Sequence, residues 1–170
     1  TTLPARPDEI WTPTWWRIDD LPEGTLIVPV PIATDRHAIP ETVPGPLHVL
    51  HVAGRRAAAD RNGTLSLYRA LALVDEPMVV TISTQEERLP VVKNIPAHVT
   101  VRTMLAGTAP ANYWDLYPGH DVLVMPRKYG GLCLPIQEAA AAGLALVMPN
   151  VSPNTNYPTA LVDCVSAGSL

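Results

Sequence analysis

Short apolar runs recur along the chain from Leu47 onward, separated by more polar stretches. The runs do not alternate strictly between apolar and polar residues, which is typical of strands buried on both faces of a sheet. They predict strands at Leu47–Ala53, Met78–Ser83, Val99–Met104, Asp121–Met125 and Leu144–Met148, with a sixth at Leu161–Val165.

Three helical patterns lie between these runs. The first begins at Thr64, and the second is capped by Thr108 and carries the aromatic residues of segment 113–117. A third, alanine-rich helix begins near Pro135 and ends at Gly143, because glycine adopts the left-handed conformation that terminates helices.

Strand and helix therefore alternate over residues 47–170, which predicts one α/β domain with a doubly wound parallel sheet and helices on both faces. Residues 1–46 differ, since they are rich in proline and tryptophan and hold one convincing strand, Leu26–Val30. We expect them to form a linker segment that buries its tryptophans against another part of the protein.

Composition and charge narrow the class of protein. The 170 residues are 47% hydrophobic and 16% charged, which excludes disorder. The low charge indicates either a surface partly covered by another domain or subunit, or a deeply buried parallel sheet. A net charge of −4 argues against a general nucleic-acid binder. Two cysteines are too few for a disulfide framework and favour a cytoplasmic setting, and no apolar run reaches the roughly 18 residues of a membrane span.

Basic residues gather in two loops that follow predicted strands. Segments 54–63 and 126–134 together hold five of the twelve Lys and Arg residues. Ligands of an open parallel sheet bind beyond the carboxyl ends of its strands, so this clustering indicates an anion site, with phosphate favoured at two adjacent helix N-termini. The alternative is that arginines are simply common on exposed loops.

Several familiar sites are excluded by missing motifs. The chain has no G-x-G-x-x-G, no G-K-[ST] and no G-x-S-x-G, so a nicotinamide-binding domain, a P-loop and an α/β-hydrolase lose support. His48 and His51 point to opposite faces of their strand, which favours structural histidines over a metal site. Cys133 is interpreted as a small buried loop residue, because no histidine lies near it in sequence to make it a nucleophile.

One segment resembles a known family, the donor-binding domain of GT-B glycosyltransferases of the group 1, retaining type. The family's motif E-G-F-G-L-P-L-L-E-A is similar to Gly130-Gly131-Leu132-Cys133-Leu134-Pro135-Ile136-Gln137-Glu138-Ala139. Glu138 matches the second glutamate of the family's E-x7-E pattern, whereas Gly130 stands in place of the first. Upstream, Arg55 matches the family's G-R, and Asn62 occupies the position of its lysine, with Arg61 one residue earlier.

The resemblance implies a Rossmann-like fold and a set of binding residues. Glu138 is expected to bind the ribose of the donor, and the donor diphosphate is expected to contact Arg55, Arg61, Gly131, Leu132, Cys133 and Leu134. The donor sugar is assigned to Lys128, Tyr129 and Gly130, and the base to the backbone near Met104 and Leu105. No residue is assigned a catalytic role, and neither a metal nor a cofactor is expected.

The implied activity is transfer of a hexose-type sugar from a UDP- or GDP-sugar to an acceptor. The family works with an N-terminal acceptor domain, so we expect a fragment that meets this domain or a partner chain, through which it associates with a membrane surface. Two alternatives stay open: a non-catalytic sugar-nucleotide-binding module, and another GT-B enzyme such as a sugar-nucleotide epimerase. A phosphorylase is disfavoured because Lys93 and Lys128 are the only lysines available for pyridoxal phosphate.

Overall fold

The computed structural model describes residues 9–15, 17–36, 44–55, 60–90, 93–127, 132–151, 154 and 160–162. The chain divides into two compact units, Thr1–Ile32 and Ala33–Leu170. The larger unit holds nearly all of the regular structure and is the one that bears on function.

The smaller unit is built around a short parallel pair of strands. β1 (Trp11–Thr12) pairs with β2 (Leu26–Ile27), and the 3-10 turn η1 (Ile18–Asp20) lies between them. The predicted strand at Leu26–Val30 is confirmed only for its first two residues. Trp11 is 64% and Trp15 48% exposed, and Trp16 lies outside the described residues, so the packing of the tryptophans against another part of the protein stays a prediction.

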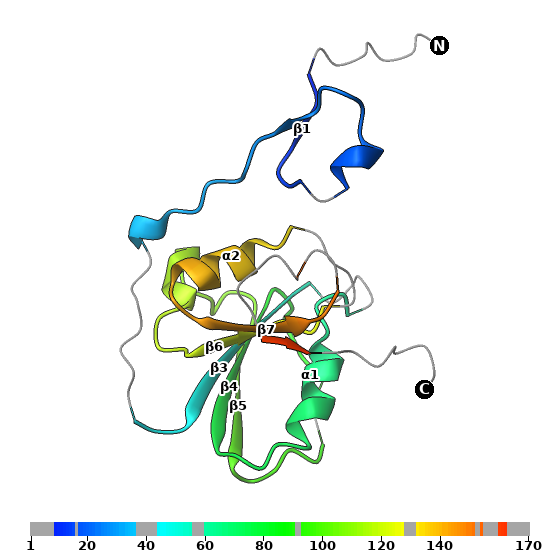
Figure 1. Cartoon of the computed structure of the whole chain (residues 1–170). Coiled ribbons are helices and arrows are strands. Elements are labelled where there is room, and N and C mark those ends of the chain that lie inside the picture. Colours follow the sequence, from blue (N-terminus) through cyan, green and yellow to red (C-terminus); the bar gives the residue numbers. More distant parts are fainter. Residues whose placement is uncertain are drawn as a thin grey trace. The chain divides into compact units, whose positions relative to one another are not determined.

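The larger unit contains a six-stranded, all-parallel sheet, shown in Figure 1. Its strand order is β5-β4-β3-β6-β7-β8. Counted along the chain from β3, this order is 3-2-1-4-5-6, which is consistent with a Rossmann-like fold. The predicted strands are confirmed with small shifts at their ends: β3 (Leu47–Gly54), β4 (Met78–Thr84), β5 (Val99–Met104), β6 (Val122–Val124), β7 (Ala145–Pro149) and β8 (Ala160–Val162).

Helices lie on both faces of this sheet, as the pattern predicts. Figure 1 shows α1 (Thr64–Leu71) and α2 (Leu134–Ala141) on opposite sides. The side chains of β3 alternate accordingly: Leu50 belongs to the apolar cluster that contains α2 residues, whereas Val49 and Ala53 belong to the cluster that contains α1 residues. The central strand is therefore buried on both faces, which explains its lack of polar alternation.

The first and third predicted helices are confirmed and the second is wrong. α1 begins at Thr64, and Gly143, at φ +79°, follows the end of α2. Between β5 and β6, the structure has only the 3-10 turn η3 (Tyr113–Leu116), and the hydroxyl of Thr108 bonds the Leu105 carbonyl instead of capping a helix. Pro118 ends this segment, because proline has no N–H with which to continue a helix, although Tyr117 before it still has helical backbone angles.

Candidate functional site

The sheet changes its direction of winding between β3 and β6. The chain proceeds from β3 to β4 on one side and from β6 to β7 on the other. In sheets of this kind, ligands bind at this point beyond the carboxyl ends of the strands. The loops after β3 and β6, which hold the basic residues singled out in the sequence, both start at this edge.

The loop after β3 is fixed at its start by hydrogen bonds to one carbonyl. Gly54, at φ +61°, accepts a bond from the Thr84 hydroxyl at 2.8 Å and another from the Gln85 backbone amide at 3.2 Å. These bonds tie the loop to the end of β4. Arg55 therefore leaves the sheet from an anchored position, with its side chain exposed.

Asn62 also anchors this loop. Its side-chain amide donates to the carbonyls of Val52 and Ala53, both at 3.1 Å. Asn62 occupies the position of the lysine in the resembled family, and here its side chain holds the loop against β3. Arg61, the neighbouring residue, is exposed, as is Arg55 at the start of the loop.

A carboxylate already occupies the N-terminus of α1. The two carboxylate oxygens of Asp60 accept hydrogen bonds from the backbone amides of Thr64 at 2.8 Å and Leu65 at 3.0 Å. These amides and the helix dipole are what a bound phosphate would use. The expectation of phosphate at two helix N-termini is therefore wrong for α1, which leaves α2.

Gly63 brings the two basic loops into direct contact. A Cβ atom on Gly63 would lie 1.8 Å from the carbonyl oxygen of Pro126, the residue that begins the loop after β6. Gly63 also has φ +78°, a conformation that other residues adopt only with strain. A glycine is thus required here for the loop before α1 to touch the loop before α2.

Cys133 lies immediately before α2, and its thiol is influenced by the charges of Arg127, Glu138 and Arg61. Burial raises the pKa of its thiol, while the guanidinium groups of Arg127 and Arg61 act in the opposite direction. The thiol is free and buried, which confirms its interpretation as a small buried loop residue. Its neighbours Leu132 and Leu134 are half-buried and 39% exposed, respectively, and the backbone amides of this segment start α2.

Arg127 is a site residue to which the sequence analysis gave no individual role. It is the third residue after the end of β6, and its side chain is only 4% exposed. Its guanidinium group and that of Arg61 both lower the pKa of the Cys133 thiol, the residue just before α2. Its position in the sequence could have identified it, because it is the second residue after Met125 and so lies at the carboxyl edge of the predicted sheet.

Glu138 forms a buried pair with Tyr117. The Tyr117 hydroxyl donates a hydrogen bond to one carboxylate oxygen of Glu138. A helix that begins near Pro135 would place Glu138 in its first turn, where a carboxylate could serve only to complement the helix dipole. That placement is wrong, because α2 begins at Leu134 and Glu138 lies in its second turn. The alternative that it merely complements the helix dipole loses support, since that effect fades beyond the first turn. The partner Tyr117 was not identified as a site residue from sequence.

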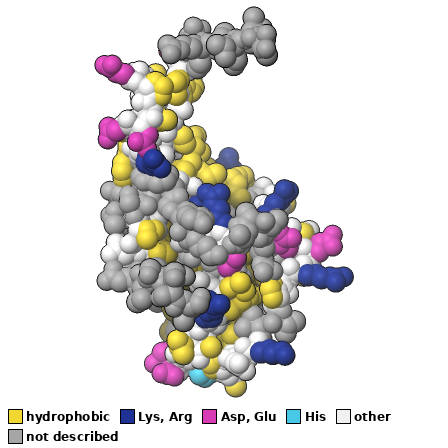
Figure 2. All heavy atoms as spheres, turned by 90° about the vertical axis from the view of Figure 1, so that its right-hand side faces the viewer, with side chains coloured by type: hydrophobic (Ala, Val, Ile, Leu, Met, Phe, Trp, Pro, Cys, Tyr) yellow, Lys and Arg dark blue, Asp and Glu magenta, His cyan; other side chains and the backbone are white. Residues whose placement is uncertain are grey.

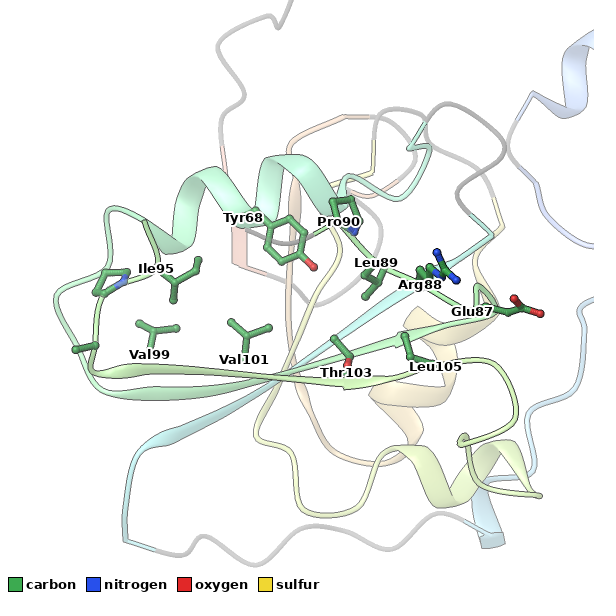
Figure 3. A pocket seen from close by; sticks show the side chains of 12 residues that line it. Tyr68, Glu87, Arg88, Leu89, Pro90, Ile95, Val99, Val101, Thr103 and Leu105 are labelled. Atoms are coloured by element: carbon green, nitrogen blue, oxygen red, sulfur yellow. The ribbon is translucent and has the colours of Figure 1, made fainter. Parts of the chain in front are cut away.

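A groove lies elsewhere among the described residues, along the edge strand β5. It has a volume of about 700 Å³, and Figure 3 shows Tyr68 of α1 facing Val99 and Val101 of β5 across it. Leu105, assigned to the base in the sequence analysis, lines the groove at the carboxyl end of β5, whereas Met104 is not among its lining residues. The connection from β4 to β5 has no helix in its described residues, which leaves this side of β5 partly open.

Four predicted site residues lie outside the described part of the chain. They are the sugar-binding candidates Lys128, Tyr129 and Gly130, and the diphosphate-binding candidate Gly131. Their assignments stay predictions.

Metal-binding clusters and membrane-spanning helices are both absent from the described residues. No group of three or more His, Cys, Asp or Glu side chains within them is arranged to hold a metal ion. Neither helix in this part of the chain has the length and hydropathy needed to cross a membrane.

The described cations on the face shown in Figure 2 do not form a continuous basic surface. On the face shown in Figure 2, Lys and Arg side chains are interspersed with acidic and exposed apolar ones. This distribution fits the net charge of −4 and a local anion site better than a long nucleic-acid-binding surface.

No family model matches this sequence, and no curated protein is similar enough to count as a relative.

Proposed function

We propose that the unit Ala33–Leu170 binds the nucleoside diphosphate part of a sugar nucleotide, as the donor-binding half of a GT-B glycosyltransferase. The observation that carries this proposal is the meeting of two basic loops at the carboxyl edge between β3 and β6. Gly63 contacts Pro126 there, and Arg61 and Arg127 lie near the start of α2. Of the ligand classes that use this edge of a parallel sheet, a diphosphate fits two guanidinium groups and one helix N-terminus best.

The diphosphate is expected to bind at α2 alone. Asp60 takes the amides of α1, so the backbone amides of Leu132, Cys133 and Leu134 are the remaining ones at a helix start. Arg61 and Arg127 supply positive charge beside them, and Arg55 is exposed on the same loop as Arg61. The positive end of the α2 dipole adds to this attraction.

This arrangement supports a transferase chemistry based on leaving-group stabilisation. When a sugar leaves a nucleoside diphosphate, negative charge develops on the terminal phosphate. Fixed guanidinium groups and backbone amides stabilise that charge in the transition state without a metal ion or covalent intermediate. A UDP- or GDP-sugar is the donor class that the resemblance implies, and Glu138 is the ribose ligand of this proposal.

A non-catalytic binding module is the second candidate. It is favoured by Gly130, which stands where the resembled family has the first glutamate of its motif. The reaction of that family takes place between two domains, so we expect the unit described here to bind a sugar nucleotide and not to transfer its sugar at an enzyme-like rate. Robust transfer to an acceptor by these 170 residues would show that this expectation is wrong.

A thermal-shift screen tests the proposal. UDP, GDP, ADP and TDP, each with a common sugar derivative, are added to the full chain, with inorganic phosphate and free nucleosides as controls. A ligand at a hundredfold excess over its dissociation constant stabilises the folded state by about 2.7 kcal/mol, which raises Tm by roughly 5–10 °C for a chain of this size. Stabilisation by at least one nucleoside diphosphate, but not by its nucleoside, is expected, and the absence of any such shift at millimolar ligand would contradict the proposal.

A further inference from the structure

Glu138 is a buried carboxylate on α2, a helix that contributes side chains to an apolar cluster. Its exposed fraction is 9%, and the cluster on this face includes Leu123, Ile136 and Ala139. Burying a carboxylate is unfavourable unless hydrogen bonds satisfy it. An apolar side chain would fill the same place without that cost, so folding alone gives no reason for a glutamate here.

Tyr117 compensates for this charge. It lies directly after η3, its side chain is 1% exposed, and its hydroxyl donates to one oxygen of the Glu138 carboxylate. Burial, followed by the hydrogen bond to Glu138, raises the pKa of Tyr117, so its hydroxyl keeps the proton that it donates at neutral pH. The carboxylate has a second oxygen with its own lone pairs available to accept.

We infer that Tyr117 is a positioning residue that sets the ribose specificity of the site, by holding Glu138 through one oxygen while the other accepts a ribose hydroxyl. This inference rests on the proposed function, because it requires a nucleotide at the carboxyl edge of the sheet. A carboxylate held in one orientation loses less side-chain freedom when the ligand binds. The site therefore selects ribonucleotides over their deoxy analogues, and the selection depends on the Tyr117 hydroxyl.

The experiment measures this selectivity in variants of the full chain. Isothermal titration compares UDP and GDP with their 2′-deoxy and 3′-deoxy analogues. The variants are Tyr117→Phe, which removes only the hydroxyl, and Tyr113→Phe, a control on the exposed side of the same turn. Near-ultraviolet circular dichroism and thermal melting establish that each variant is folded.

A hydrogen bond to a charged group contributes about 1.5–3 kcal/mol, so wild type should bind the ribonucleotide at least about tenfold more tightly than one deoxy analogue. Tyr117→Phe should reduce this ratio by about tenfold and leave the affinity for the deoxy analogue within about twofold of wild type. Tyr113→Phe should leave both unchanged. A folded Tyr117→Phe variant with the wild-type ratio would overturn the inference.

A second variant covers the case in which Tyr117→Phe does not fold. Glu138→Gln keeps the shape of the side chain and an oxygen that accepts from Tyr117, but it removes the charge. It should also lower the ribose-to-deoxyribose ratio, and an unchanged ratio would count against the inference. If no nucleoside diphosphate binds wild type, the proposed function fails and this inference with it. If ribose and deoxyribose forms bind wild type equally, only the role of Tyr117 and Glu138 fails.

Discussion

At the scale of single residues, His51 is held in one neutral form by two neighbours. Its Nδ1 lies 2.9 Å from the carbonyl oxygen of Val124, and its Nε2 lies 3.0 Å from the hydroxyl oxygen of Thr64. A carbonyl can only accept, so Nδ1 carries the proton and Nε2 accepts from Thr64. Burial lowers the pKa of His51, and this outweighs the bond to Val124 and the charge of Asp60. The side chain thus links β3, β6 and the start of α1, as expected of a structural histidine.

This environment predicts how stability depends on pH. Below about pH 6.5, the unfolded chain takes up a proton at His51 that the folded chain does not. The free energy of unfolding therefore decreases as the pH is lowered. The slope reaches at most about 1.4 kcal/mol per pH unit for this group. Burial and the nearby His48 also lower the pKa of His120, although its hydrogen bond to Tyr117 and the charge of Asp121 oppose them. His120 therefore adds to the loss of stability at low pH.

Urea unfolding at pH 7.5, 6.5 and 5.5 checks this prediction. The variant His51→Asn keeps a donor for Val124 but does not titrate, so its stability should fall less steeply with acid than that of wild type. His98→Asn, at an exposed position, is the control. Parallel curves for wild type and His51→Asn would contradict the neutral, buried state of His51.

At the scale of elements, the contact between the two basic loops depends on Gly63. The variant Gly63→Ala should destabilise the protein by two mechanisms. A left-handed alanine costs about 1–2 kcal/mol, and a Cβ atom 1.8 Å from backbone oxygen forces the loops apart, which adds about 1–3 kcal/mol. Because the displaced loops carry Arg61 and Arg127, nucleotide binding should weaken as well.

Gly119→Ala is a matched control for this prediction. Gly119 has φ +80° but no atom within 4 Å of an added Cβ, so it isolates the backbone strain. Chemical denaturation should show that Gly63→Ala is less stable than Gly119→Ala by at least about 1 kcal/mol. Equal losses in the two variants would mean that the loops can separate freely and that their contact does not organise the site.

The elements of the sheet were largely predictable from sequence, whereas the contacts between elements were not. Apolar runs identify β3 and β4 because each strand is buried on both faces. The predicted helix before β6 failed because Pro110 and Pro118 limit its length more strongly than Trp114 and Tyr117 favour it.

The parts of the site that were missed depend on tertiary packing. Tyr117 and Glu138 are 21 positions apart, and only the packing of η3 near α2 brings them together. The role of Asp60 as a cap was also missed, because it precedes the helix by four residues and acts through a left-handed turn at φ +53°. The place of Arg127 and the contact between the loops at Gly63 depend on β3 and β6 being neighbours in the sheet. Sequence patterns do not determine the order of strands in a sheet.

At the scale of the whole molecule, an acidic protein is proposed to bind a negatively charged diphosphate at a single local site. The net charge of −4 repels anions at long range, so the affinity must come from nearby groups at the carboxyl edge between β3 and β6. Strand order, the glycine contact and the cations near Cys133 all converge on that edge. Diphosphate binding should therefore depend on single side chains at this edge, such as Arg61.

The most direct test is isothermal titration of the full chain and its Arg61→Ala variant with UDP and GDP, and with uridine and guanosine as uncharged counterparts. Arg69→Ala, an exposed arginine in the last turn of α1, is the matched control. The account predicts that Arg61→Ala weakens binding of a nucleoside diphosphate by about 10- to 150-fold, the equivalent of about 1.5–3 kcal/mol, and leaves nucleoside binding and the Arg69→Ala variant unchanged. Equal effects of Arg61→Ala and Arg69→Ala, or no binding of either diphosphate to wild type, would contradict it.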